Sequence, residues 1–142
     1  MGGLIGLATK DKDGLSYKGW NPTRVYFGKI GYLKIASVTP FEGTTIYFCS
    51  QEAGQTLRYC NYIIQLAGGN NTGTNGTANT HKVFDNLNKH FYLKSGNNTD
   101  SEVYCNITTY EWINIWTPTE QGKIIAEYVE SLPSDVMEIN PI

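Results

Sequence analysis

The side chains that most often perform catalysis are sparse in this chain. Its two histidines, His81 and His90, are nine positions apart and lack the close spacing of metal ligands. No G-x-S-x-G segment marks an activated serine. Glu102 and Glu111 are candidates for the acid pair of a glycosidase, but a chain with 13 acidic residues offers such pairs by chance. We therefore expect no enzymatic activity, no cofactor and no metal site.

The cysteines indicate buried thiols rather than a disulfide framework. Three of them, Cys49, Cys60 and Cys105, are an odd number, so they cannot all pair within one chain. Each lies in an apolar run, which favours a free and buried thiol. Cys49 and Cys60 could still meet on neighbouring strands, so the sequence leaves one disulfide open.

Aromatic residues are the most suggestive chemical feature, with ten Tyr and three Trp in 142 residues. Rings on strands can stack against sugar rings while neighbouring amides and carboxylates bind sugar hydroxyls. The same rings suit protein interfaces and cross-strand packing in a core, and these three alternatives stay open. The candidate glycan-binding or interface aromatics are Tyr59, Tyr62, Tyr104, Trp112 and Trp116.

Seven runs of strand length must position these side chains. They are rich in β-branched and aromatic residues, and clusters of Gly, Pro, Asn and Asp separate them. No stretch repeats apolar residues with the helical period over three turns. Strands without intervening helices predict antiparallel pairing and an all-β fold, a sandwich or a barrel. The runs are 24–38, 44–50, 56–66, 89–95, 101–109, 111–117 and 123–131.

Alternation within the runs predicts which side chains face the core. In the run 101–109, Val103, Cys105 and Ile107 should face one way and Tyr104 the other. The segment WINIW (112–116) is apolar on both faces, which predicts a central or covered strand. The Gly-, Asn- and Thr-rich segment 67–80 is expected to be a long flexible surface loop.

Composition excludes several function classes. The formal net charge is −2, only 17% of residues are charged, and the Lys and Arg residues form no cluster, so we expect no nucleic-acid partner. No apolar run approaches the ~18 residues of a transmembrane helix. The N-terminal segment lacks the basic region of a signal peptide. These features predict synthesis in the cytoplasm without membrane insertion.

The first 24 residues differ from the rest of the chain. They contain five glycines, a D-G pair at 13–14 and an N-P pair at 21–22, which are turn signals too closely spaced for a regular element. We expect 1–24 to form an extended attachment arm and 25–142 to form the β-sandwich domain. The candidate docking residues of the arm are Leu4, Ile5, Leu7 and Leu15.

Three segments resemble the small fibre and head-fibre proteins of tailed bacteriophages, in particular those of crAss-like gut Bacteroidetes phages. The leader MGGLIGLATKDKDGLSYKG (1–19) is similar to their Gly-Leu-rich attachment peptides, with DKDGLSYKG (11–19) as the charged turn and the Gly-Leu element that follows it. The segment GYLKIASVTPFEGTTIYFCS (31–50) looks like the first two strands of fibre-tip sandwiches. The segment HFYLKSGNNTDSEVYCNIT (90–108) resembles their later strands.

The resemblance implies a virion structural protein rather than an enzyme. In that family the domain is a jelly-roll-like antiparallel β-sandwich that usually forms a homotrimer and projects outward, and the N-terminal arm binds other virion proteins, on the capsid or the tail. Some of these tips bind host-surface glycans. We therefore expect a virion-located head- or tail-fibre subunit. The alternative is a stand-alone carbohydrate-binding module.

Overall fold

The computed structural model describes residues 22–54, 57–70 and 72–142. All the regular secondary structure within these ranges is β-strand. The predicted docking residues Leu4, Ile5, Leu7 and Leu15 lie outside the described residues, as does most of the predicted arm. Thr23 and Arg24 already belong to the first strand, so this strand begins two residues before the predicted start of the domain. The described part of the chain contains no helix long and apolar enough to span a membrane.

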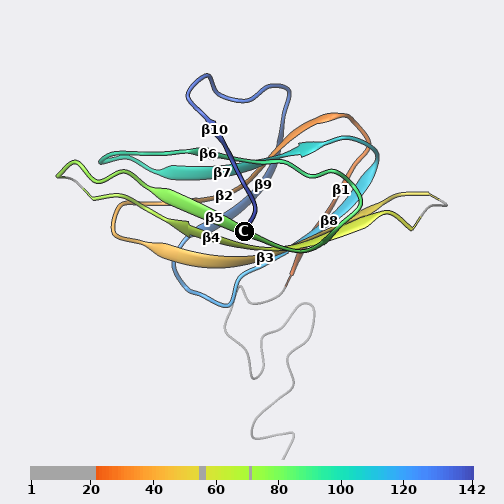
Figure 1. The fold of residues 1–142 in the computed structure, drawn as a ribbon, viewed down its shortest axis with the longest axis horizontal. Coiled ribbons are helices and arrows are strands. Elements are labelled where there is room, and N and C mark those ends of the chain that lie inside the picture. The colour runs from red at the N-terminus through yellow and green to blue at the C-terminus, as the bar shows by residue number, and fades with distance from the viewer. Residues whose placement is uncertain (1–21, 55–56, 71) are drawn as a thin grey trace, which may run out of the picture.

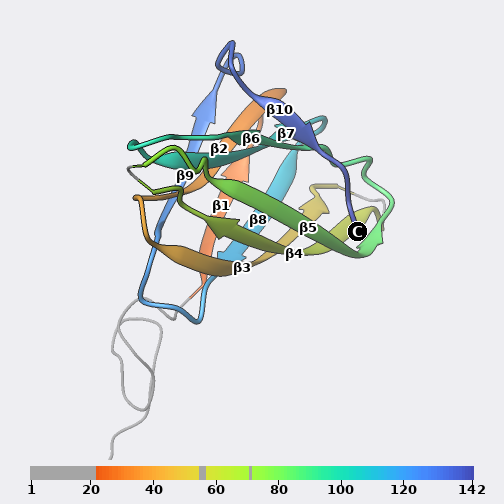
Figure 2. The same cartoon turned by 60° about the vertical axis from the view of Figure 1, so that its left-hand side comes forward.

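Ten strands form two five-stranded sheets that stack face to face (Figures 1 and 2). Sheet A contains, in spatial order, β1 (Thr23–Phe27), β8 (Glu111–Trp116), β3 (Gly43–Glu52), β4 (Tyr59–Ala67) and β5 (Thr77–Asp85). Sheet B contains β10 (Met137–Ile139), β6 (Phe91–Lys94), β7 (Ser101–Ile107), β2 (Gly31–Val38) and β9 (Lys123–Val129).

Every strand pair is antiparallel, which confirms the predicted all-β antiparallel sandwich. The first strands pair with late ones, β1 with β8 and β2 with β7, which is the nested pairing typical of a jelly roll. The strands β3, β4 and β5 are connected by hairpin pairing, β3 with β4 and β4 with β5, and β3 also pairs with β8.

The core lies between the two sheets. It consists of the side chains that every second residue of a strand points toward the opposite sheet. On β7, Val103, Cys105 and Ile107 are buried, as alternation predicts. The segment WINIW belongs to β8, which has a partner strand on each side, so its predicted central position is confirmed. Its inner residues Ile113 and Ile115 are fully buried. Burial of aliphatic and aromatic side chains from both sheets is the main stabilising contribution to such a core.

The prediction of a long loop over 67–80 is wrong in its length. Ala67 ends β4 and Thr77 begins β5, so the connection is only 68–76. The polar outward residues of β5 hid its strand pattern, because only Ala78 and Thr80 face the core in this half of the strand. The run 24–38 also divides into β1 and β2 at the turn 28–30.

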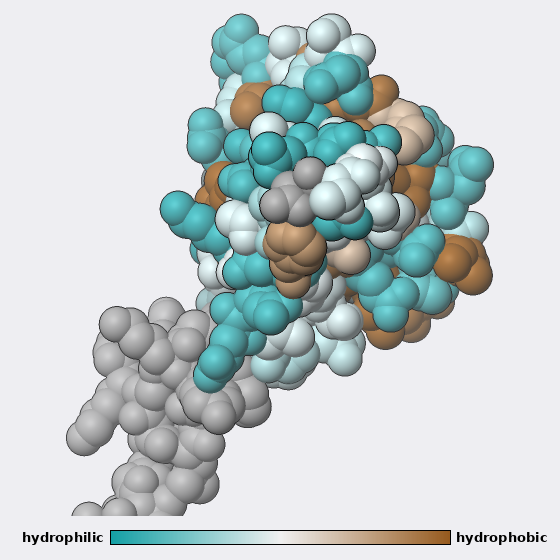
Figure 3. Space-filling view, turned by 90° about the vertical axis from the view of Figure 1, so that its left-hand side faces the viewer, coloured by the Kyte–Doolittle hydropathy of each residue, from teal (hydrophilic) through white to brown (hydrophobic). Residues whose placement is uncertain are grey.

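The connection 68–76 packs closely against two other loops at one end of the sandwich, which is the end facing the viewer in Figure 3. The amide of Phe41 donates to the carbonyl of Gly69, and the amide of Gly76 donates to the carbonyl of Gly96. A Cβ atom on Gly68 would collide with the carbonyl oxygen of Thr39. The glycines therefore allow close backbone approach, and the loops hold one another.

Candidate functional site

The side of sheet A that faces away from sheet B carries six aromatic side chains of the described residues. Because successive residues of a strand face opposite sides, each strand that buries one set of residues presents the other set outward. We call this surface the outer face. Its members are Arg24, Tyr26, Trp112, Asn114, Trp116, Thr45, Tyr47, Cys49, Gln51, Tyr59, Asn61, Ile63, Gln65, Ala67, Thr77, Asn79, His81 and Phe84.

Six aromatic rings form three pairs between neighbouring strands of this face. Their centroids lie 4.7 to 5.1 Å apart, which is the normal range for interacting aromatic rings. Most of these rings remain about 40% exposed, so packing between them fixes their orientation without hiding them. The pairs are Tyr26 with Trp112, Tyr47 with Trp116, and Tyr59 with Phe84.

A row of small polar side chains crosses the sheet between the ring pairs. Asn114 lies opposite Cys49, and Cys49 lies opposite Asn61 on the next strand. Asn114 also separates the two tryptophans of β8, which are roughly 13 Å apart at the usual rise of a strand. Amide side chains between flat rings provide both donors and acceptors for hydroxyl groups.

An open hollow of about 280 Å³ continues the face beyond the pair formed by Tyr47 and Trp116. Five residues belong to both the outer face and the lining of the hollow: Thr45, Gln65, Ala67, Thr77 and Asn79. Its other lining residues are Gly43, Thr44, Leu66 and Thr119. The hollow therefore offers many hydroxyl and amide groups beside an aromatic platform.

Hydrogen bonds fix the threonines at one side of the hollow. The hydroxyl of Thr117 is 2.9 Å from those of both Thr44 and Thr119, and the hydroxyls of Thr44 and Thr119 also bond each other. The amide of Gly43 donates to Oε1 of Gln121 at 2.9 Å. The β8–β9 loop is thus attached to the start of β3, which gives this rim of the hollow a defined shape.

Three of the five predicted aromatic residues meet on the outer face. Tyr59, Trp112 and Trp116 lie on β4 and β8 and each belongs to one of the ring pairs. The sequence analysis missed their partners Tyr26, Tyr47 and Phe84, and it also missed Asn114. Alternation against the buried neighbours of each strand is the signal that could have found them.

The other two predicted aromatics, Tyr62 and Tyr104, are buried and cannot form an exposed surface. Tyr62 is 3% exposed on the inner side of β4, and its hydroxyl donates to Oδ2 of Asp85 at 2.6 Å. Tyr104 is 4% exposed on β7, and its hydroxyl donates to Oε1 of Glu102 at 3.0 Å. Burial, followed by the neighbouring carboxylate, raises the pKa of each phenol well above its ordinary range.

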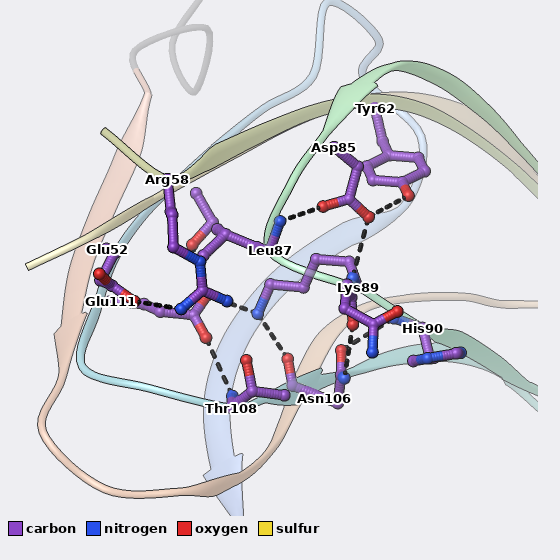
Figure 4. Close-up of polar contacts among 12 residues, drawn as sticks. Glu52, Arg58, Tyr62, Asp85, Leu87, Lys89, His90, Asn106, Thr108 and Glu111 are labelled. Atoms are coloured by element: carbon purple, nitrogen blue, oxygen red, sulfur yellow. Dashed lines mark hydrogen bonds and ion pairs between the residues drawn. The ribbon is translucent and has the colours of Figure 1, made fainter. Parts of the chain in front are cut away.

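A cluster of buried charges lies on the inner side of the same sheet (Figure 4). The side chains of Lys89 and Glu111 form an ion pair and are both fully buried. Ser50 Oγ donates to Glu111 Oε1 at 2.5 Å, and the amide of Thr108 donates to Oε2 at 3.1 Å. Lys89 Nζ also donates to the carbonyl oxygen of Asn106 at 2.6 Å.

This cluster joins parts of both sheets. Ser50 and Glu111 belong to sheet A, Asn106 belongs to β7 of sheet B, and Lys89 lies in the β5–β6 connection between the sheets. Asp85 holds the start of that connection by accepting the amides of Leu87 and Lys89 at 2.7 and 2.9 Å. The charged groups of the cluster are paired, hydrogen-bonded and buried, so the cluster connects the two sheets inside the sandwich.

The other candidate groups from the sequence are not assembled into a reactive site. Glu102 lies on sheet B, where it pairs with Lys34, while Glu111 is buried on the inner side of sheet A. His81 bonds Gln65 on the outer face, whereas His90 is 3.3 Å from Glu138 at β10. Within residues 22–54, 57–70 and 72–142, no three His, Cys, Asp or Glu side chains cluster as metal ligands would.

The cysteines occupy two different environments. Cys49 faces outward and is exposed, which corrects the expectation that all three thiols are buried, while Cys60 and Cys105 lie in the core. Cys49 and Cys60 do lie on neighbouring strands, but Ser50 is the residue opposite Cys60, so the two thiols point to opposite faces. All three are free, and burial raises the pKa of Cys105 to about 12.

No protein-family model matches the chain, and no curated protein matches it. Among solved structures, the fold is similar to that of WceF from Pantoea stewartii, described as a glycan biofilm modifying enzyme with a bacteriophage tailspike-like parallel β-helix fold. The TM-score is 0.59 and the identity 11%, over 91% of this chain but only 24% of that protein. The chain thus spans about a quarter of its length, and at this identity the similarity concerns the fold alone.

Proposed function

We propose that the protein is a non-enzymatic subunit of a bacteriophage head or tail fibre, and that its β-sandwich binds host-surface glycans through the outer face of sheet A. The observation that carries the proposal is the set of three exposed ring pairs separated by amide side chains. Rings of this kind present flat apolar surfaces to the CH groups of sugars, and the amides between them bind hydroxyls.

The arrangement favours an extended oligosaccharide over a single sugar. The ring pairs span all five strands of sheet A, and the two tryptophans of β8 are separated by roughly 13 Å. The hollow lined by Thr45, Gln65 and Asn79 extends the polar part of the surface. A broad, shallow site with polar groups distributed along it matches a chain of sugars lying across the sheet.

Two further observations support the phage context. The attachment-like leader 1–19 and the strand segments resemble phage fibre proteins. The fold is similar to part of a protein described as tailspike-like and glycan-modifying. In this proposal residues 1–24 attach the subunit to capsid or tail proteins, the subunit forms a homotrimer in the virion, and no cofactor takes part.

The glycan function is tested with a glycan array and two matched variants. Tyr47→Ala removes a ring from the outer face, whereas Tyr92→Ala removes a ring from the Tyr32–Tyr92 pair on sheet B. We expect the unmodified protein to bind at least one bacterial surface oligosaccharide, and Tyr47→Ala to lose about tenfold or more in affinity. Equal losses in the two variants, or no binding by the unmodified protein, would contradict the proposal.

The fibre function is tested by deletion of residues 1–21, which stops short of β1. We expect the truncated protein to fold and to bind glycans as before, but to be absent from purified particles. If the truncated protein is incorporated into particles at the normal level, the arm has no attachment role. A protein that binds glycans but is never found in particles would favour the alternative, a stand-alone carbohydrate-binding module.

A further inference from the structure

Arg24 occupies an unusual position on the outer face. It lies on β1, opposite Asn114, with its guanidinium carbon 4.2 Å from the centre of the Trp112 ring. The side chain is exposed, and no carboxylate among the described residues pairs with it. The contact with Trp112 fixes a planar cation on the surface while its hydrogen-bond donors stay available.

The outer face contains no acidic residue within its strands. Although the chain has 13 acidic residues, none of the outward-facing residues of β1, β8, β3, β4 and β5 in the described part of the chain is Asp or Glu. Sheet B differs, because Glu102 pairs there with Lys34 and Lys94. The only fixed positive charge on the outer face is therefore free of competing carboxylates among the described residues.

We propose that the outer face recognises an acidic oligosaccharide, with a sugar carboxylate bound by the guanidinium of Arg24. This inference rests on the proposed glycan-binding function and specifies its ligand class. Arginine suits this role because its planar fork of donors matches the two oxygens of a carboxylate. Trp112 acts as a positioning residue: its ring contacts the guanidinium of Arg24 and packs against Tyr26, so it orients the cation.

The position of Arg24 also suggests how the sugar chain lies. Asn114 and Asn61 continue from Arg24 across the sheet, and the ring pairs lie on both sides of this polar row. A carboxylate at Arg24 would place the neighbouring sugars over Asn114 and toward the pair formed by Tyr47 and Trp116. The acidic sugar would then occupy the β1 side of the face, and neutral sugars would occupy the hollow.

The experiment compares acidic oligosaccharides with their own neutral derivatives. The probes are uronic-acid- and sialic-acid-containing bacterial oligosaccharides, each paired with the same molecule after chemical reduction of its carboxyl groups. The proteins are the full chain, Arg24→Gln, Arg24→Lys, and the control Lys123→Gln, which removes a positive charge from the exposed part of β9. Circular dichroism and thermal melting establish that each variant is folded.

We expect the unmodified protein to bind acidic probes and to lose about tenfold or more when the carboxyl groups are reduced. Arg24→Gln should lose a similar factor on acidic probes and nothing on neutral ones, and Arg24→Lys should be intermediate because it keeps the charge without the fork. Lys123→Gln should bind normally.

Other outcomes overturn the inference in distinguishable ways. Binding that is equal for acidic and reduced probes, or unaffected by Arg24→Gln, would reject the acidic ligand and leave the glycan-binding function standing. Absence of binding to every probe would reject both. If light scattering shows that Arg24→Gln or Tyr47→Ala changes the oligomeric state without any glycan bound, the face is a contact between copies of this chain.

Discussion

The two sides of sheet A are built by the same strands but differ in their chemistry. Glu111 and Trp112 are consecutive residues of β8, yet the first is fully buried in an ion pair and the second is 38% exposed in a ring pair. On β3, Ser50 completes the buried cluster while Cys49 lies in the polar row outside. Alternation thus separates the groups that hold the two sheets together from those available to a ligand.

The difference means that substitutions on the two sides should have different consequences. Inner residues are enclosed, so each change leaves a cavity or an unpaired group. Outer residues mainly contact one another and solvent, so a change there removes one ring contact and part of a recognition surface. The following experiments compare the two sides, beginning with the largest expected effect.

Breaking the buried ion pair should be the most damaging change. Lys89→Met leaves the carboxylate of Glu111 enclosed without its counter-charge, and we expect unfolding free energy to fall by about 3–5 kcal/mol. The matched control is Lys29→Met, since Lys29 pairs with Glu130 at the surface, and it should cost less than about 1 kcal/mol. Urea denaturation measures the unfolding free energy of both variants. Similar losses in the two variants would show that the buried cluster does not stabilise the contact between the sheets.

Phe48 and Tyr47 are neighbours on β3 that face opposite sides. Phe48→Ala removes a fully buried ring, which should cost about 3–5 kcal/mol. Tyr47→Ala removes a partly exposed ring and its contact with Trp116, which should cost about 0.5–1.5 kcal/mol. Denaturation of both variants under one set of conditions tests the difference, and a loss in Tyr47→Ala as large as that in Phe48→Ala would indicate that the outer face also supports the fold.

Asp85 should contribute through its three acceptor contacts. Asp85→Asn replaces one carboxylate oxygen with an NH₂ group that faces donors, so we expect a loss of about 1–3 kcal/mol. Tyr62→Phe removes only one of the three donors and should cost about 1 kcal/mol. The prediction fails if Tyr62→Phe is the more destabilising of the two.

Thiol reactivity should separate the two sides without affecting stability. Native protein should react at Cys49 alone, while Cys60 and Cys105 should react only after unfolding. Burial raises the pKa of Cys49 above its usual 9.0, and only the thiolate reacts, so the labelling rate should rise with pH until it passes this raised pKa. Mass spectrometry after labelling at several pH values identifies the site; rapid labelling of Cys60 in native protein would indicate an open core.

Much of the fold follows from local sequence patterns. The strands β3, β4, β7 and β8 combine β-branched or aromatic residues with alternation, and each was predicted close to its final position. The strands β5 and β10 were missed because polar residues dominate the first and the second has only three residues. Their strand conformation depends on pairing with β4 and β6, which their own sequences do not indicate.

The site was less predictable because it depends on which strands become neighbours. Tyr47 and Trp116 are 69 positions apart and meet only when β3 pairs with β8. Tyr62 alternates in step with Cys60 and Ile64 in the sequence, so its burial could have been inferred from this pattern. Tyr104 could not be assigned in this way, because it faces away from Val103 and is nevertheless buried.

The last residues of the chain pass from one sheet to the other. After β10 has paired with β6 at the edge of sheet B, the amide of Ile142 donates to the carbonyl of Thr80 on β5, the edge strand of sheet A (Figure 2). A free strand edge is a template on which another molecule can add a strand, which is a common beginning of aggregation. By occupying part of the β5 edge, these residues restrict the addition of a further strand there.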